Sequence, residues 1–324
     1  MITDIHRHFV PYDFFHYLQS NDQFPVKVKR SEGDSIDVEI RGIHFGLNKT
    51  FFELPRHLEL MNDQNVDRGI LSLATPFIDY WLDEKFAVEF ARQYNDALVA
   101  STSSRGKEFG AWAFLPMQDP ARAAEELRRC VRELGCVGGH VATNVRGVYL
   151  HDPQFTVVFQ AAVDLDVPLF VHPADPLGKE RLQDYELMVV AGYLCDSTIN
   201  ILKMVCSGFL DKWPKLKLVC AHTGAFSLPL RARMQREVDT NPRLASNLQA
   251  SIGDYLRRLY YDTVCFEPAM LRFAASIVPT SHLLLGSDAP FPLAEPNPVA
   301  FVSNALPECS DTILRENFSR LTGQ

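Results

Sequence analysis

The sequence predicts an α/β fold: a (β/α)8 TIM barrel with a small antiparallel β insert after its first strand. From residue 56 onward, short apolar runs alternate with helical stretches, as in a parallel sheet covered by helices. The length of 324 residues suits one such barrel with a modest insertion. Potential metal ligands end several of the apolar runs, where barrel enzymes carry their chemistry. We therefore expect residues 1–324 to form one barrel domain.

The segment after the first strand interrupts this alternation. A strand is predicted over residues 2–8 and is stopped by a proline-containing loop. Residues 12–55 then contain two alternating runs, 26–29 and 36–40, on either side of a turn with Gly33, a pattern that predicts a β-hairpin. The segment has too few large apolar residues to bury a core of its own. It is therefore expected to be an insert within the barrel domain.

The remaining elements follow as alternating strands and helices. Strands are predicted over 69–74, 109–115, 136–141, 167–171, 216–221, 259–263 and 283–286. Helices are predicted over 56–65, 83–101, 119–134, from 152 onward, over 184–209, and near 267–277 and 310–320. The most clearly marked helix has Asp119 as its N-cap, Pro120 at its first position and Gly135 as its stop.

Composition argues against several classes of protein. The net charge of −8 offers no basic face for a nucleic-acid partner. No apolar run approaches the roughly 20 residues needed to span a bilayer, and no signal peptide is recognisable, so no membrane partner is expected. The seven cysteines are scattered, without a C-x-x-C pair, which is typical of reduced thiols. These features predict a cytoplasmic protein.

Two histidines end the first predicted strand. Side chains at i and i+2 of a strand point to one face, so His6 and His8 are expected roughly 6–7 Å apart along it, within reach of one cation. Three later predicted strands end in His172, His222 and Asp288. Because the carboxyl ends of barrel strands meet at one rim, these five side chains are predicted to converge there.

The residue types of this set favour one divalent ion. Imidazole and carboxylate ligands suit Zn²⁺, or Mn²⁺, Fe²⁺ or Co²⁺ in a more open site. His6, His8, His172 and Asp288 can hold one ion and leave a position for water or substrate. His222 would then carry protons beside the bound water, since histidine titrates near neutral pH. Each residue alone has a structural alternative, such as a solvated strand end, a hydrogen-bonded histidine or a helix cap, so the prediction rests on the whole set.

Several motifs spread over nearly the full chain resemble the amidohydrolase superfamily. They are DIHRHFVP at 4–11, LPMQ at 115–118, LFVHP at 169–173, KWPKLK at 212–217, AHTG at 221–224, GSDAPFP at 286–292 and the tail at 317–323. Within the superfamily, the chain resembles the branch around 2-amino-3-carboxymuconate-6-semialdehyde decarboxylase. The H-x-H pair and the antiparallel insert match that branch.

The resemblance implies a chemistry for the predicted site. His6, His8, His172 and Asp288 would bind one divalent ion, with zinc as the first expectation, and His222 would be the acid/base that acts together with Asp288. The implied enzyme is a carboxy-lyase that protonates the carbon bearing a carboxylate and releases CO2 without oxidation. The alternative on the same scaffold is a hydrolase or hydratase that adds water to a C–C or C=C bond of a dicarboxylic substrate. A non-catalytic metal-storage barrel is a third hypothesis from another class.

The resemblance is weaker on the substrate side. A family arginine that grips a substrate carboxylate aligns with His57, with Arg56 one residue earlier, and a second one that reaches across a dimer interface matches Arg233. Phe291 lies in a loop expected to shape the pocket floor. These four residues are the predicted contacts of a small carboxylate substrate, and a homodimer is expected. The departures from the family pattern predict a substrate other than that of the branch's namesake.

Overall fold

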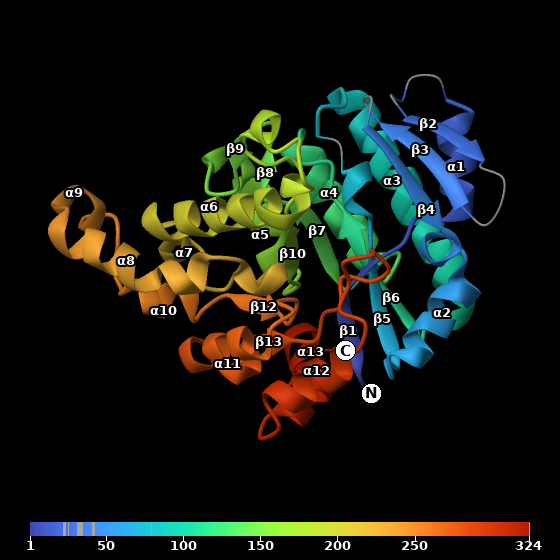
Figure 1. Ribbon diagram of the computed structural model, residues 1–324. Helices are drawn as coiled ribbons and strands as arrows, with labels where there is room; N and C mark the ends of the chain where they lie inside the picture. Colours follow the sequence, from blue (N-terminus) through green and yellow to red (C-terminus); the bar gives the residue numbers. More distant parts are fainter. Residues whose placement is uncertain (22–23, 25, 31–34, 41–42, 79, 324) are drawn as a thin grey trace.

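The computed structural model describes residues 1–324 except 22–23, 25, 31–34, 41–42, 79 and 324 (Figure 1). A sheet of eight parallel strands lies at its centre and confirms the predicted barrel. In hydrogen-bonded order the strands are β1 (Thr3–His8), β5 (Arg68–Ser72), β6 (Phe109–Phe114), β7 (Gly138–Ala142), β10 (Leu169–His172), β11 (Leu218–Cys220), β12 (Tyr260–Asp262) and β13 (Leu283–Leu284).

The barrel closes where the chain beyond β13 runs beside β1. The amide of Ile5 donates to the carbonyl of Leu285 at 2.9 Å, and the amide of Asp288 donates to the carbonyl of His6 at 2.9 Å. A parallel bridge between Arg7 and Ala289 extends this pairing. The first and last strands therefore hold the predicted ligands of the two chain ends side by side.

Helices surround the strands, mostly between one strand and the next (Figure 1). They are α2 (Leu54–Asp63), α3 (Glu84–Thr102), α4 (Pro120–Arg132), α5 (Thr156–Asp164), α6 (Tyr193–Cys206), α7 (Phe209–Lys212), α8 (Ser227–Thr240), α9 (Pro242–Ala245), α10 (Ile252–Leu256), α11 (Pro268–Ile277), α12 (Pro298–Ala305) and α13 (Asn317–Thr322). The Asp119 side chain accepts a hydrogen bond from the amide of Arg122, as expected of the N-cap of α4.

The insert after β1 is larger than the predicted hairpin. Helix α1 (Tyr12–Gln19) precedes an antiparallel sheet of three strands, β2 (Val26–Arg30), β3 (Ser35–Ile40) and β4 (Ile43–Asn48). The predicted runs correspond to β2 and β3, and most of the predicted turn between them lies outside the described residues. Strand β4 was not predicted, although its sequence IHFGLN alternates apolar and polar positions as a half-buried strand does. A second unpredicted hairpin, β8 (Asn144–Val145) with β9 (Val148–Tyr149), follows β7.

The barrel interior is filled with large apolar side chains below the predicted site. The cluster includes Ile5, Ile70, Trp112, Phe170, Val219 and Leu284, all fully buried. Burial of such side chains contributes about 1.5–3 kcal/mol each. Trp112 stacks on Phe170 with ring centroids 5.5 Å apart and donates its indole N–H to the carbonyl of Ile5 at 2.8 Å. The interior is thus a packed floor for the site above it.

The glycine pair in β7 has a packing role. A Cβ added to Gly138 would lie 2.1 Å from the carbonyl oxygen of Pro168, and one added to Gly139 would lie 2.7 Å from a methyl group of Leu169. Only glycine permits β7 to approach the neighbouring chain this closely.

A buried network of charged and polar side chains connects β1 to neighbouring segments. Arg7 is fully buried and donates to Asp4 at 2.8 Å and to Gln64 at 2.8 Å. Asp4 in turn accepts hydrogen bonds from the amide and the hydroxyl of Ser287. Removal of one partner from such a buried pair costs about 3–5 kcal/mol, because the other charge is left uncompensated. The network therefore ties the strand of His6 and His8 to the segment of Asp288.

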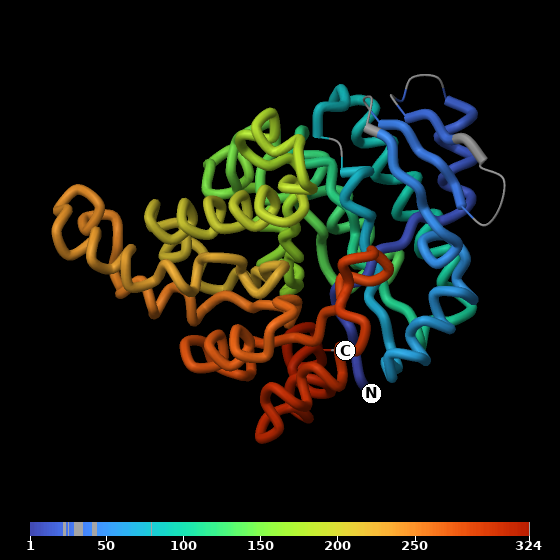
Figure 2. The backbone as a smooth tube through the Cα atoms, viewed as in Figure 1, coloured from blue at the N-terminus to red at the C-terminus, as the bar shows by residue number. Residues whose placement is uncertain are grey.

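One part of the chain extends away from the barrel. Helices α8 and α9 form an arm that projects from the body, and the two chain termini lie near each other (Figures 1 and 2).

Among the described residues, one helical stretch, Met188–Cys206, is long and apolar enough by length and composition to cross a membrane, with a mean hydropathy of 1.3. A core helix of a barrel meets the same criterion, so this stretch is weak evidence for a membrane span.

Candidate metal centre

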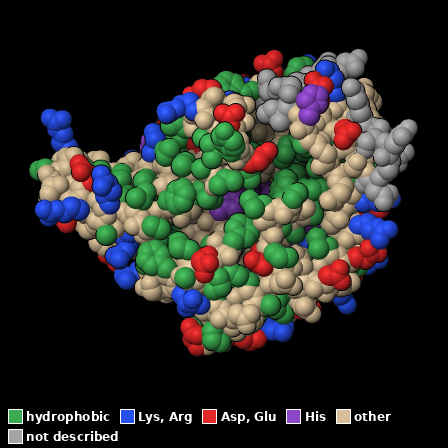
Figure 3. All heavy atoms as spheres, in the orientation of Figure 1, with side chains coloured by type: hydrophobic (Ala, Val, Ile, Leu, Met, Phe, Trp, Pro, Cys, Tyr) green, Lys and Arg blue, Asp and Glu red, His purple; other side chains and the backbone are tan. Residues whose placement is uncertain are grey.

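The five predicted polar residues lie at the carboxyl ends of the barrel strands. His6 and His8 are at the end of β1, His172 ends β10, His222 follows β11 and Asp288 follows β13. Figure 3 shows histidine side chains at the bottom of a central hollow that is surrounded mainly by hydrophobic side chains. The site is therefore reached from one face, through an apolar opening.

The donor atoms of these residues converge. The Nε2 atoms of His6 and His8 are 3.1 Å apart, and they lie 3.2 and 3.0 Å from Oδ1 of Asp288. The donor atoms of His6, His172, His222 and Asp288 all lie within 4.8 Å of one another. His8 is not in that group of four but reaches it through its contacts with His6 and Asp288. Each residue thus offers an atom to one small central space.

The outer nitrogens of three histidines are held by hydrogen bonds. Nδ1 of His6 contacts a carboxylate oxygen of Asp262 at 2.6 Å, Nδ1 of His8 contacts the carbonyl of Leu73 at 3.2 Å, and Nδ1 of His172 contacts the carbonyl of Pro173 at 2.8 Å. Carboxylate and carbonyl acceptors fix the proton on Nδ1, which leaves the lone pair of Nε2 free. All three rings are oriented as metal ligands require.

The inward-facing nitrogen of His172 has no hydrogen-bond partner among the described residues. Nε2 of His172 is buried, and no described polar atom lies within hydrogen-bonding distance of it. A buried acceptor left unpaired costs about 1–3 kcal/mol, and a cation at the centre of the cluster would satisfy it. Three imidazoles and a carboxylate are also the ligand types of zinc and of related divalent ions. The residues present therefore fit a divalent metal ion.

The electrostatics of the cluster favour a positive charge at its centre. Burial of His6 opposes its protonation, but the carboxylates of Asp288 and Asp262 raise its pKa to about 10. Burial would raise the pKa of Asp288, yet the charge on His6 and hydrogen bonds from the histidines hold it well below its usual range. Burial lowers the pKa of both His8 and His172. The site thus combines an ionised Asp288 with neutral His8 and His172, while His6 carries a proton that a bound metal ion would replace.

His222 differs from the other histidines in its backbone and its contacts. It lies in a left-handed turn, with φ of 55° at His222, 53° at Thr223, 69° at Gly224 and 53° at Ala225. Its Nε2 lies 3.5 Å from Oδ2 of Asp288, and its Nδ1 has no hydrogen-bond partner among the described residues. The ring is therefore at the edge of the donor cluster, without the anchoring bond that the rings of His6, His8 and His172 have.

The two predicted substrate contacts on α2 have other partners. His57 is fully buried; its Nε2 accepts from Nε of Arg7 at 2.9 Å and its Nδ1 donates to the carbonyl of Thr50 at 2.9 Å. Burial and then the charge of Arg7 hold the pKa of His57 well below its usual range, so the ring is neutral. Arg56 is on the exposed face of α2 and pairs with Glu59 at 2.8 Å. Both ring nitrogens of His57 thus have partners within the protein.

The other two predicted contacts have different surroundings. The half-buried ring of Phe291 packs edge-on against His8 and against Phe51, with centroids 5.0 Å apart in each case. Phe291 thus borders the cluster. Arg233 lies on the projecting helix α8, where its side chain is exposed. Within one chain the structure does not bring Arg233 together with the other predicted site residues.

The sequence interpretation missed Asp262 at the end of β12. Its carboxylate bonds His6 and the backbone of the turn that begins at His222. The available signal was its position, because a carboxylate near the carboxyl end of the predicted strand 259–263 lies at the same rim as the histidines. His140, inside β7, is buried beside His172 with ring centroids 6.1 Å apart, and neither of its nitrogens has a partner among the described residues.

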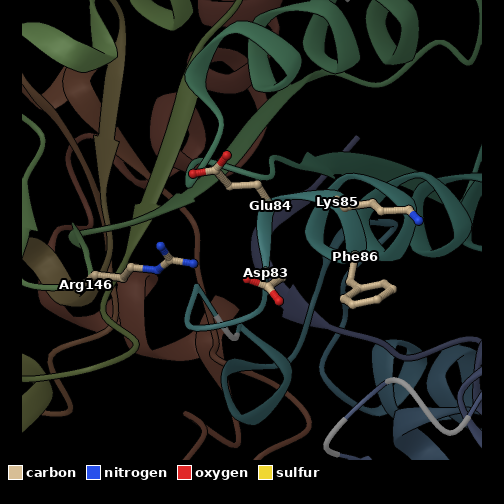
Figure 4. A pocket seen from close by; sticks show the side chains of 5 residues that line it. All are labelled: Asp83, Glu84, Lys85, Phe86 and Arg146. Carbon is tan, nitrogen blue, oxygen red and sulfur yellow. The ribbon is translucent and has the colours of Figure 1, made fainter.

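A cavity of about 380 Å³ lies away from this cluster. It is lined by Asp83, Glu84, Lys85, Phe86 and Arg146 (Figure 4). The Arg146 guanidinium donates to the backbone carbonyls of Tyr80 and Leu82 at 2.7 and 2.8 Å. That contact shapes the loop before α3, and none of the converging donors lines the cavity.

Several known proteins are similar to this chain in sequence. The family model described as amidohydrolase matches residues 3–319. A 2-amino-3-carboxymuconate-6-semialdehyde decarboxylase of Dictyostelium discoideum is 29% identical over 79% of this chain and 71% of its own length. A gamma-resorcylate decarboxylase of a Polaromonas species is 30% identical over 73% of this chain and 76% of its own.

A solved structure has the same architecture. The dihydroxybenzoic acid decarboxylase from a Polaromonas species, with bound manganese and the inhibitor 2-nitroresorcinol, superposes with a TM-score of 0.81 at 24% identity. The superposition covers 99% of this chain and 96% of that structure. With the family match over nearly the full length and the converging histidines and aspartate at the barrel rim, the chain belongs to the amidohydrolase family.

Proposed function

We propose that the protein is a metal-dependent, non-oxidative decarboxylase, a carbon–carbon lyase acting on an aromatic acid or a carboxylated ring-cleavage product. The observation that carries this proposal is the convergence of His6, His8, His172 and Asp288, with His222 beside them. The related proteins named above are decarboxylases of this kind, which favours loss of CO2 over the hydrolase or hydratase alternative.

The ligand set is proposed to comprise His6, His8, His172 and Asp288. Support comes from the three anchored Nδ1 atoms and from the unpartnered Nε2 of His172. A divalent ion bound there supplies Lewis-acid polarisation of the substrate. We propose zinc as this ion, because three imidazoles and one carboxylate suit it. Manganese, which a relative's structure contains, is the next candidate.

His222 is proposed to handle the proton. Its ring borders the cluster at Asp288 and lacks an anchoring hydrogen bond, so Nε2 can hold or release a proton at the site. In the reaction, the proton adds to the ring carbon that bears the carboxylate. The bond from that carbon to the carboxylate then breaks, its electron pair returns to the ring, and CO2 leaves. The net change is replacement of a carboxylate by hydrogen, with no oxidant consumed.

The opening of the site fits a flat, largely apolar substrate. Phe291 borders His8 within the site. The segments that follow the strands also carry large exposed apolar side chains: Trp81, Leu177, Tyr185, Phe226, Phe266 and Leu293. Apolar walls with few polar groups are typical of pockets that bind an aromatic ring and use the polar groups for orientation.

We also propose a homodimer in which Arg233 approaches the site of the partner subunit. Its support is the exposure of Arg233 on an arm that projects from the barrel (Figure 2). The exposed side chains of Met270 and Phe273 on α11 offer apolar surface for such an interface. Light scattering at micromolar concentration should give twice the monomer mass. A monomer under these conditions would contradict the proposal.

The decisive experiment measures CO2 release. Purified, metal-analysed protein is incubated with ortho-hydroxy and ortho-amino aromatic acids and with carboxylated muconic semialdehydes. We expect release of CO2 that increases with bound metal and disappears after chelation, and the responding compound identifies the substrate. Metal-loaded protein that forms no CO2, but a product heavier by one water, would instead establish the hydrolase or hydratase.

A further inference from the structure

The carboxylate of Asp262 accepts four hydrogen bonds between the end of β1 and the turn after β11. It ends β12 and is fully buried. Its Oδ2 lies 2.6 Å from Nδ1 of His6 and 2.9 Å from the amide of His222. Its Oδ1 accepts the amides of Thr223 at 2.7 Å and Val264 at 3.1 Å. One carboxylate therefore bonds a proposed metal ligand of β1 and the backbone of the proposed proton carrier after β11.

The bond to His6 determines which nitrogen faces the cluster. Asp262 accepts the Nδ1 proton, so the lone pair of His6 Nε2 is directed toward His8 and Asp288. The corresponding bonds of His8 and His172 end on backbone carbonyls. Of these three anchors, only that of His6 is a side-chain carboxylate, and hydrogen bonds to carboxylates are among the stronger ones in proteins.

The bonds to the turn offset an unfavourable backbone conformation. Left-handed φ angles are unfavourable at the non-glycine residues His222 and Thr223. In this conformation their successive amides point to one side, and such a pair of N–H groups binds an anion. Asp262 is that anion, and the hydroxyl of Thr223 also donates to its backbone carbonyl at 3.1 Å. The turn is thereby held where the His222 ring borders Asp288.

We infer that Asp262 is a positioning residue that couples the metal ligand His6 to the proton carrier His222. The inference rests on the proposed function for the role of His222, and on the geometry alone for the bond to His6. Four donors share two carboxylate oxygens, so an asparagine at this position cannot replace the aspartate. Its amide nitrogen would face either the His6 and His222 donors or the Thr223 and Val264 donors.

The test compares Asp262→Asn with the wild type in two independent measurements. The first is metal affinity by competition with a chromogenic chelator, which needs no substrate. We expect affinity 10–100-fold weaker, the usual effect of losing an outer partner of a metal-binding histidine. The second is steady-state decarboxylation at saturating metal. We expect kcat to remain at least tenfold lower, because the His222 turn is displaced, with KM changed less than threefold.

Asp196→Asn is the matched control. Asp196 is also fully buried, and it accepts hydrogen bonds from Tyr149 at 2.7 Å and Asn144 at 3.0 Å without contacting the cluster residues. It should lose thermal stability but keep metal affinity within about twofold and kcat unchanged. If Asp196→Asn lowers both quantities as Asp262→Asn does, the effect is general loosening of the fold and the inference is wrong.

A second variant tests the coupling between His6 and His222 if Asp262→Asn does not fold. Thr223→Ala removes the hydroxyl that bonds the Asp262 backbone carbonyl and the Cys265 side chain but leaves the Asp262 carboxylate in place, so it should lower kcat and leave metal affinity unchanged. Unchanged kcat in Thr223→Ala, or full recovery of kcat by Asp262→Asn at saturating metal, would overturn the coupling. Wild-type protein that binds metal but releases no CO2 would overturn the proposed function, while the affinity comparison would still test the bond to His6.

Discussion

Asp288→Ala is expected to lose bound metal and activity together. The carboxylate contacts Nε2 of both His6 and His8 and lies 3.5 Å from that of His222, so its removal leaves three imidazoles without their charged partner. Loss of a direct ligand should weaken metal binding by more than the 10–100-fold that follows loss of an outer partner. Elemental analysis after dialysis, together with CO2 release, measures both effects.

His6→Ala should behave in the same way, because its Nε2 lies 3.2 Å from Asp288 and 3.1 Å from Nε2 of His8. His16→Ala is the matched control: this histidine is exposed on α1 and takes no part in the cluster. It should retain both metal and turnover. Full metal occupancy in Asp288→Ala or in His6→Ala would show that the residue is not a ligand.

Removal of the His222 ring is expected to abolish turnover while the metal stays bound. Nε2 of His222 lies 3.5 Å from Asp288 and its ring is edge-on to those of His6 and His172, but its Nδ1 has no partner among the described residues. The anchored nitrogens of His6, His8 and His172 would be unaffected. Loss of a general acid or base lowers rates by about 10²–10⁴-fold. Metal content and kcat, measured on the same His222→Ala preparation, test this separation.

The left-handed backbone at His222 requires a second variant. Alanine is strained at a φ of 55°, whereas asparagine adopts this region more readily. His222→Asn therefore removes the imidazole with less disturbance of the turn, and it should match His222→Ala in both metal content and lost turnover. Because the donor atom of His222 lies within 4.8 Å of those of His6, His172 and Asp288, loss of the ion from both variants would make His222 a ligand.

The barrel could be predicted because its information is local. Buried parallel strands require short apolar runs, and helix ends require capping residues, so the strands and the Asp119 cap of α4 are recognisable from neighbouring residues alone. The insert was only partly predictable. The sequence IHFGLN of β4 alternates as a strand does, but its pairing with β3 is a contact between strands that no pattern within the segment specifies.

The candidate metal centre was likewise predictable where its pattern is local and unpredictable where it depends on contacts between distant segments. The sequence by itself determined the convergence of His6, His8, His172, His222 and Asp288, because each ends or closely follows a strand and all parallel strands of a barrel end at one rim. Only the tertiary structure decided which groups form hydrogen bonds with the outer nitrogens of these histidines. Asp262 on β12 meets His6 on β1 past the intervening β13, and Arg7 donates a hydrogen bond to Nε2 of His57, a predicted substrate contact. Such contacts join side chains far apart in sequence, and their geometry follows from packing of the whole chain, which no local pattern encodes.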